Sequence, residues 1–191
     1  MGLKYDVSEY FKEFAKIQSD EIIDDWNEAL AMLVDAWKRN LKIFVAGNGG
    51  NFLNALHFST DWNKGVFLAT GKSLNTSVSG ENQGLISAIQ NDDGQDISII
   101  NYYKYVMKEA DIFVLMSAGG SSQNILNAAS FAKEKGIRTI GLTGGLFRQP
   151  EGTFSKCLHF NSSDMQIVED IHAMFGHTVL KAIIKESENL F

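Results

Sequence analysis

The chain contains 191 residues, of which 45% are hydrophobic, carries a formal net charge of −6 and has one cysteine, Cys157. This length predicts a single domain with or without a short arm, and one cysteine excludes both an intramolecular disulfide framework and a cysteine-based zinc cluster. The acidic balance argues against nucleic acid or an anionic membrane as the main partner, because both are bound through clustered Lys and Arg.

The N-terminal segment gives no sign of a targeting sequence. Its first residues, MGLKYDVSEYFKEF, carry a charge every few positions and lack the apolar centre of a signal peptide. No tract approaches the roughly 18 apolar residues that a membrane-spanning helix requires. We therefore expect a protein of the reducing cytoplasm that has no membrane partner.

Residues 5 to about 38 are predicted to form two amphipathic helices. Apolar residues recur at steps of three and four, first from Val7 to Phe14 and then from Ile22 to Trp37. The polar triplet Gln18-Ser19-Asp20 separates the two series and offers its Ser or Asp as the N-cap of the second helix. Because these helices come before the first predicted strand, their apolar faces must be buried against another part of the protein or another subunit. Residues 1–40 are therefore predicted to form a helical arm for oligomerisation, which packs on another subunit, on the following domain, or on both.

Residues 41–191 are predicted to form the main domain, in which short apolar tracts alternate with helical stretches. Strands are predicted at 42–46, 111–116, 138–142 and 156–160. Helices are predicted from the loop after the first strand to about Trp62, from about 123 to 135, and over 164–188. Strands that are apolar on both faces and alternate with helices indicate a covered parallel sheet. The predicted fold class is α/β, a doubly wound parallel sheet flanked by helices.

Neither nucleotide-binding motif that the glycines suggest is complete. The loop Gly47-Asn48-Gly49-Gly50 begins like the dinucleotide fingerprint, but Phe52 occupies the place of its last glycine. The irregular tract 64–80 is expected to add a strand and a loop near the ligand site. Within it, Gly65 and Gly71 are separated by five residues where a P-loop requires four. We therefore expect no nucleotide cofactor.

A second glycine loop offers a receptor for a small anion. Ser117, Ser121 and Ser122 lie between an apolar strand and a helix, beside Gly119 and Gly120. Hydroxyl groups and free backbone N–H groups at the positive end of a helix suit a phosphate monoester. Helix capping and chain reversal alone would also account for these residues, so both interpretations stay open.

Several short motifs follow one another in a fixed order between about residues 42 and 180. They are Gly47-Asn48-Gly49-Gly50, His57, Asn91-Asp92 with Gly94, Ser117 to Ser122, Gly136 to Gly144, Ser162 with Asp164, Glu169 to His172, and His177. Each motif is weak alone. In this order and spacing they resemble the sugar isomerase (SIS) domain family and, within it, the phosphoheptose isomerases, whose helical N-terminal arm is also similar.

The resemblance implies an aldose–ketose isomerase that converts sedoheptulose 7-phosphate to D-glycero-D-manno-heptose 7-phosphate through an enediol, in heptose and surface-glycan biosynthesis. It also implies a homotetramer with its sites at subunit interfaces. The family's general base corresponds to Asp61, and its acid/base partner corresponds to His177. The positions implied for substrate binding are Asn48, Gly49, Gly50, Asn51, Asp92, Ser117, Gly119, Ser122 and Glu169.

The resemblance further implies a zinc ion, which some members bind at the positions of His57, Asp61, Glu169 and His177. His57 and Asp61 are four residues apart and share one helix face. Glu169 and His177 are eight residues apart, about 12 Å along a helix. They cannot both touch one ion unless the helix bends or the ligands come from different subunits. Two imidazoles and two carboxylates suit Zn²⁺ or another divalent ion.

The sequence departs from the family pattern at four places. Asp61 replaces a Glu, Glu169 replaces a Gln, Asn51 replaces a Ser, and the loop from Ser117 to Ser122 lacks two of the usual hydroxyl positions. Two functions therefore stay open. Retention of Asp61 and His177 favours an isomerase with a variant active site, whereas the altered loop favours a non-catalytic SIS module that binds a sugar phosphate or a protein partner as a regulator.

Overall fold

The structure is a computed structural model that describes residues 4–17, 20–107 and 109–188. Its centre is one sheet of five parallel strands in the spatial order β2-β1-β3-β4-β5. The strands are β1 (Ile43–Gly47), β2 (Thr76–Val78), β3 (Ile112–Ser117), β4 (Arg138–Gly144) and β5 (Lys156–Phe160). The predicted doubly wound parallel sheet is confirmed, and the irregular tract 64–80 contributes the short strand β2.

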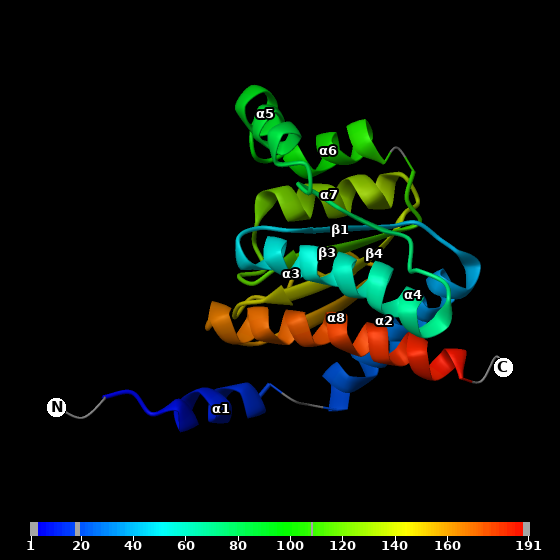
Figure 1. Ribbon diagram of the computed structural model, residues 1–191. Helices are drawn as coiled ribbons and strands as arrows, with labels where there is room; N and C mark the ends of the chain where they lie inside the picture. The colour runs from blue at the N-terminus through cyan, green and yellow to red at the C-terminus, as the bar shows by residue number, and fades with distance from the viewer. Residues whose placement is uncertain (1–3, 18–19, 108, 189–191) are drawn as a thin grey trace.

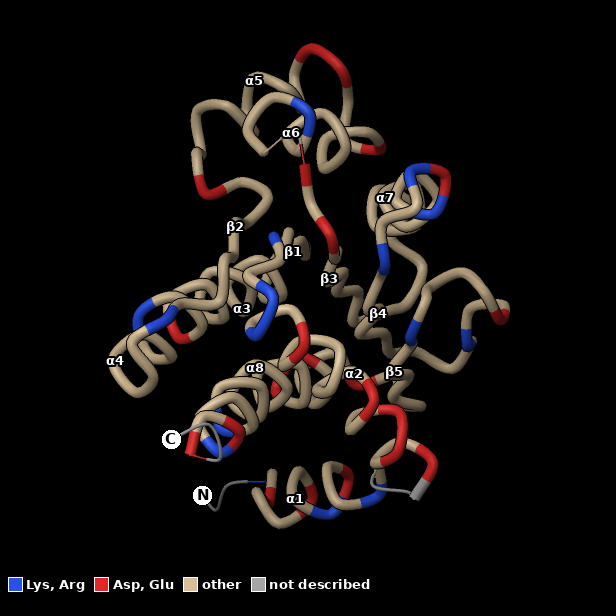
Figure 2. Tube along the Cα trace, turned by 90° about the vertical axis from the view of Figure 1, so that its right-hand side faces the viewer, with Lys and Arg blue, Asp and Glu red and all other residues tan. Residues whose placement is uncertain are grey.

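Helices cover both faces of this sheet (Figure 1). One layer contains α2 (Asp20–Arg39), α3 (Gly50–Thr60), α4 (Val66–Thr70) and α8 (Met165–Ser187). The opposite layer contains α5 (Gln83–Asp93), α6 (Ser98–Val106) and α7 (Gln123–Glu134). Figure 2 shows the two layers on either side of the strands, with acidic and basic residues interspersed along the outer helices.

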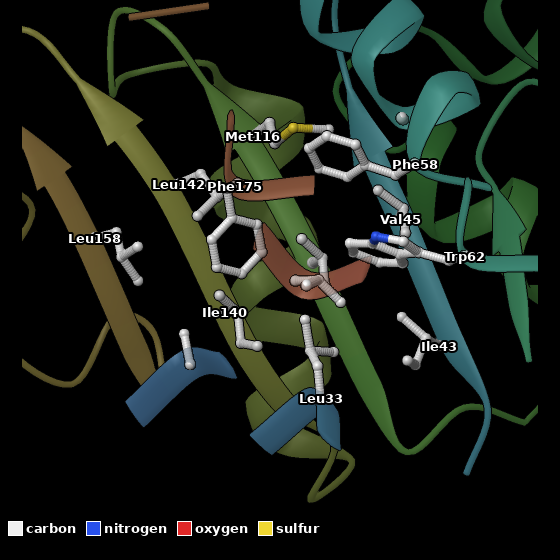
Figure 3. Close-up of a cluster of buried hydrophobic side chains, with 14 of the residues drawn as sticks. Leu33, Ile43, Val45, Phe58, Trp62, Met116, Ile140, Leu142, Leu158 and Phe175 are labelled. Atoms are coloured by element: carbon white, nitrogen blue, oxygen red, sulfur yellow. The ribbon is translucent and has the colours of Figure 1, made fainter. Parts of the chain in front are cut away.

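Both faces of the strands are buried, which explains why they appear in the sequence as continuous apolar runs. Val45, Val114 and Ile140 lie in register on neighbouring strands and pack toward the layer of α3 and α8; Figure 3 shows two of them, Val45 and Ile140. Phe44 and Phe113, also in register, pack toward α6 and α7. All six residues of β3 are buried.

The two helices of the predicted arm differ in how they pack. On α2, Leu33 and Trp37 are buried in the core beneath the sheet. No residue of α1 (Val7–Ala15) is fully buried. Tyr10 and Phe14 pack against the core while partly buried, and the Tyr10 hydroxyl donates to Asp170 Oδ2 on α8 at 2.6 Å. The predicted cap residue Ser19 and the side chain of Asp20 lie outside the described part of the chain.

Two helical stretches differ from the prediction. The helix expected to end near Trp62 continues through a π-helical turn, η1 (Asp61–Gly65), and then α4 to Thr70. The sequence indicates no secondary structure for the tract that contains α5 and α6. In the structure, Asn82 is the N-cap of α5, and its side chain accepts from Leu85 N at 3.1 Å.

In the described part of the chain, no helix combines the length and apolar character needed to cross a lipid bilayer.

Candidate active site

The carboxyl ends of β1 and β3 form the point at which the connections leave the sheet in opposite directions. The chain after β1 enters α3 on one face, and the chain after β3 enters α7 on the other. Asn48 in the first loop and Asn124 in the first turn of α7 exchange a pair of amide hydrogen bonds, each 2.9 Å long. In open α/β sheets ligands bind in the crevice at such a switch point, so the predicted glycine loops lie where a ligand site is expected.

The first glycine loop is shaped by one backbone conformation that favours glycine and by one close approach. Gly49 has a positive φ of 55°, which favours glycine, and precedes the first turn of α3. A Cβ on Gly50 would collide with the Glu169 carboxylate, so that carboxylate lies directly against the start of α3. The free N–H groups and positive end of a helix favour a negative charge there. Gly49, Gly50 and Glu169, all predicted as site residues, are thus brought together.

Asn51 lies in the first turn of α3 but faces the interior instead of the crevice. Its side chain is 2% exposed, and Asn51 Oδ1 lies 2.6 Å from Nδ1 of His172, which is completely buried on α8. Burial lowers the pKa of His172 to about 3, so the ring is neutral at physiological pH. The predicted substrate contact at Asn51 is replaced here by a contact between α3 and α8.

The second glycine loop keeps its hydroxyls near one another. Ser117 Oγ lies 3.1 Å from Ser122 Oγ and accepts from the backbone N–H of Ser122 at 3.4 Å. The Ser122 hydroxyl makes no capping bond to α7 within the described structure, so capping does not account for it. Open space surrounds the position that a Cβ on Gly119 would take. The loop therefore leaves room for a small anion beside the start of α7.

A cavity of about 270 Å³ lies between the first glycine loop and the helices α5 and α6. Its polar lining consists mainly of amide and hydroxyl groups, and none of the described residues that line it carries a charge. Those polar residues are Asn48, Ser79, Gln83, Gln90, Gln95, Ser98 and Asn124. Such groups suit the hydroxyls of a sugar better than they suit an ion. Gln83 and Gln90 lie on α5 and Gln95 lies in the turn before α6, a tract for which the sequence indicates no element, so these glutamines were not predicted. Asp92 lies exposed on α5, outside this lining.

A second cluster forms where α3 ends beside α8. His57 Nε2 lies 2.9 Å from His177 Nε2 and 3.3 Å from Asp61 Oδ2, and the His177 Nε2 to Asp61 Oδ2 distance is 3.9 Å. The side chains of His57, Asp61 and His177 are 52%, 26% and 48% exposed. Asp61 opens the π-helical turn η1, a type of turn that occurs frequently at functional sites.

The donor set of this cluster fits a divalent metal ion. One ligand atom from each of His57, Asp61 and His177 lies within 4.8 Å of the others. Two imidazoles and one carboxylate are a ligand set typical of catalytic zinc, which keeps a further position open. Glu169, the fourth predicted ligand, does not join these three side chains within the described part of the chain. Its carboxylate lies against Gly50 at the other end of α3.

The two parts of the predicted site are well separated within one chain. Gly50 and Asp61 are eleven residues apart, which corresponds to about 16 Å along a helix. The glycine loops and Glu169 therefore lie at one end of the α3–α8 pair, and the cluster of His57, Asp61 and His177 lies at the other.

Comparison with known proteins identifies the family. A family model described as the SIS domain matches residues 5–144, more than half of the chain. The chain belongs to the SIS domain family. Among the relatives of this SIS-domain protein, the phosphoheptose isomerase of Proteus mirabilis strain HI4320 is 29% identical over 180 residues, covering 90% of this chain and 89% of that protein. The phosphoheptose isomerase of Vibrio parahaemolyticus is 29% identical over 189 residues, covering 92% and 94%.

Solved structures confirm the SIS-type fold. A phosphoheptose isomerase from Francisella tularensis superimposes with a TM-score of 0.82 at 20% identity, covering 94% of this chain and 96% of that one. A phosphoheptose isomerase from Neisseria gonorrhoeae gives a TM-score of 0.76 at 22% identity, covering 93% and 96%. The SIS-domain protein therefore shares the architecture of these enzymes along nearly its whole length.

The buried neutral His172 predicts a specific pH dependence of stability. Its pKa is about 3 in the folded protein and about 6.5 when exposed, so the unfolded chain binds the extra proton between these values. The free energy of unfolding should therefore fall as the pH drops from 6.5 toward 4, by up to about 1.4 kcal/mol per pH unit from this residue. Urea unfolding measured at several pH values tests this.

The His172→Gln variant is the control for that measurement, because its amide does not titrate and all carboxylates are shared with the wild type. The wild-type curve should be steeper than that of the variant over this range. Parallel curves would contradict the assignment of His172 as a buried neutral group.

Proposed function

We propose that this SIS-domain protein is an aldose–ketose isomerase that converts sedoheptulose 7-phosphate to D-glycero-D-manno-heptose 7-phosphate in the biosynthesis of heptose-containing surface glycans. The observation that carries the proposal is the convergence of Asp61 and His177 from two separate helices. The similarity to phosphoheptose isomerases over about nine-tenths of the chain supports it. The single cysteine fits the reducing cytoplasm as the location.

The reaction requires few groups, and the cluster supplies them. Asp61 acts as the base that removes a proton from C1 of the ketose and returns it to C2. His177 moves protons between the two oxygens of the enediol. The 3.9 Å between the two side chains allows both to act on adjacent carbon and oxygen atoms of one substrate.

A divalent metal ion, with zinc as the first candidate, would be held by His57, Asp61 and His177. His177 would carry protons through the same ring nitrogen only in the metal-free cluster, because a nitrogen bound to a metal ion cannot accept a proton. When bound, such an ion polarises a carbonyl and stabilises negative charge on the neighbouring oxygen. The part that this chain plays is to bring two imidazoles and a carboxylate within reach of one centre. Glu169 joins this set only if the ion lies between two subunits, because its carboxylate lies at the far end of α3.

The phosphate and the hydroxyl groups of the substrate are assigned to the switch-point crevice. Ser117, Gly119 and Ser122 provide hydroxyl and backbone donors beside the start of α7, where a phosphate is favoured. The neutral cavity next to Asn48, lined by glutamine side chains, suits the polyhydroxyl chain. These contacts would fix the sugar without adding charge around it.

A neighbouring subunit completes the site in this proposal. The crevice and the catalytic cluster of one chain lie about 16 Å apart along α3, so a small sugar phosphate bound in the crevice needs a cluster supplied by another copy. Leu53, Phe67 and Leu68 project from α3 and α4 with exposures of 65%, 52% and 73%. Apolar side chains so exposed favour contact with a second copy, and we propose a homotetramer.

Turnover of sedoheptulose 7-phosphate tests the proposed activity directly. Aldose formation by the purified protein, followed by NMR with and without added Zn²⁺, should be lowered about 100-fold or more by Asp61→Asn and by His177→Ala. Asp35→Asn, which changes an exposed carboxylate paired with Arg39, is the matched control and should retain activity.

The non-catalytic alternative predicts a different result in the same experiment. A regulator would bind sugar phosphate without turnover, and binding measured by calorimetry would be unchanged in the Asp61→Asn and His177→Ala variants. Absence of turnover together with this unchanged binding would rule out the isomerase and leave a ligand-binding module.

Mixing two inactive variants tests whether two chains share each site. Gly119→Asp places a carboxylate where the phosphate is expected and has room for its Cβ, whereas Asp61→Asn disables the cluster. Refolding the two variants together should restore a substantial fraction of wild-type activity, because some sites combine an intact crevice with an intact cluster. Mixtures as inactive as each variant alone would show that a single chain supplies both parts.

A further inference from the structure

A buried tryptophan connects η1 and α8, the two helical segments that carry Asp61 and His177. Trp62 directly follows Asp61, and Gly176 directly precedes His177. The Trp62 indole N–H donates to the backbone carbonyl of Gly176 at 2.9 Å, and this bond is buried. A single hydrogen bond thus joins the immediate neighbours of the two groups to which we assign acid/base chemistry.

The surroundings of Trp62 hold its ring in one place. Trp62 is completely buried, and its ring stacks on that of Phe58 with centroids 5.0 Å apart and an interplanar angle of 25° (Figure 3). The Phe58 ring in turn lies where a Cβ on Gly176 would be, so only glycine at this position allows α8 to approach so closely. The Trp62 carbonyl also accepts from Leu74 N at 3.0 Å, which anchors the backbone of η1 to the segment before β2.

The cluster itself lacks this restraint. His57 and His177 are about half exposed, and Asp61 begins a π-helical turn instead of a regular α-helical one. Long-lived alignment of exposed side chains requires fixed backbone beneath them, and the bond of Trp62 supplies a buried hydrogen bond between η1 and α8. The backbone positions of Asp61 and His177 therefore depend on this bond more than on contacts between their own side chains.

We propose that Trp62 is a positioning residue for the cluster of His57, Asp61 and His177. Through Gly176 and Phe58 it sets the separation between η1 and α8, and hence whether the carboxylate and the two imidazoles converge on one centre. The part of this inference that concerns turnover rests on the proposed isomerase function. The parts that concern geometry and metal affinity do not depend on turnover.

Trp62→Phe tests the inference because it keeps an aromatic ring beside Phe58 and removes the indole N–H. Trp37→Phe is the matched control. Trp37 is 5% exposed, and its indole donates to the backbone carbonyl of Lys72 at 2.9 Å, a bond of the same kind that ties α2 to the segment after α4. Any general cost of replacing a buried tryptophan is shared by both variants.

The readout is the affinity for Co²⁺ alone, measured by calorimetry and by the visible absorbance of the bound ion. Trp62→Phe should weaken binding about 10-fold or more, as is typical when a residue supporting metal ligands is lost. Trp37→Phe should leave the affinity unchanged. In the turnover assay, kcat should fall in Trp62→Phe while KM stays the same, because the crevice at the other end of α3 is intact.

The crystal structure of the Trp62→Phe variant decides the question if the wild-type protein neither binds Co²⁺ nor turns over substrate. The separation of Asp61 and His177 should then exceed 3.9 Å in the variant. Gly176→Ala provides a second route if Trp62→Phe does not fold, since the added methyl group pushes Phe58 and α8 apart and should widen the same separation. An unchanged cluster geometry, or equal loss of Co²⁺ affinity in Trp62→Phe and Trp37→Phe, would overturn the inference.

Discussion

The close contact between α3 and α8 is the constraint on which the rest of the site depends. At Gly176 the missing side chain leaves space for the Phe58 ring, and the two helices meet there with no room for a Cβ. The same pairing places Glu169 against Gly50 and His172 against Asn51 toward one end, and His57 against His177 at the other. Each of these pairs joins one residue of α3 to one residue of α8, so a shift between the helices would disturb all of them at once.

The fold was largely predictable because a parallel sheet covered on both sides leaves a strong signal. The six residues of β3 are all buried, and their apolar run is visible in the sequence. The segment of α5 and α6 gave no such signal. On α5 only Ile89 is buried, and α6 is rich in Ile and Tyr, which are equally typical of strands. The helix after β1 was predicted to end too early, because a π-helical turn has no periodicity that distinguishes it.

The site was predictable where it follows from helical spacing and less so where it depends on which faces meet. His57 and Asp61 lie together because they are four residues apart, and their meeting with His177 agrees with the resemblance to the isomerases. The separation of Glu169 from His177 also followed from helix geometry. The burial of Asn51 could not be predicted in this way, because the sequence does not show which side of α3 faces α8. The role of Trp62 depends on the same three-dimensional contact.

The claim that Asp61 and His177 carry out proton transfer through an enediol is tested most directly by running the isomerisation in D₂O. Asp61 is 26% exposed, so a proton that it removes from C1 has access to solvent before it is returned. The account predicts heptose 7-phosphate with deuterium at C2, detected by NMR and mass spectrometry. Product that carries only the original hydrogen at C2 would contradict the account, because it would show that the transferred hydrogen is never held on a solvent-accessible Asp61.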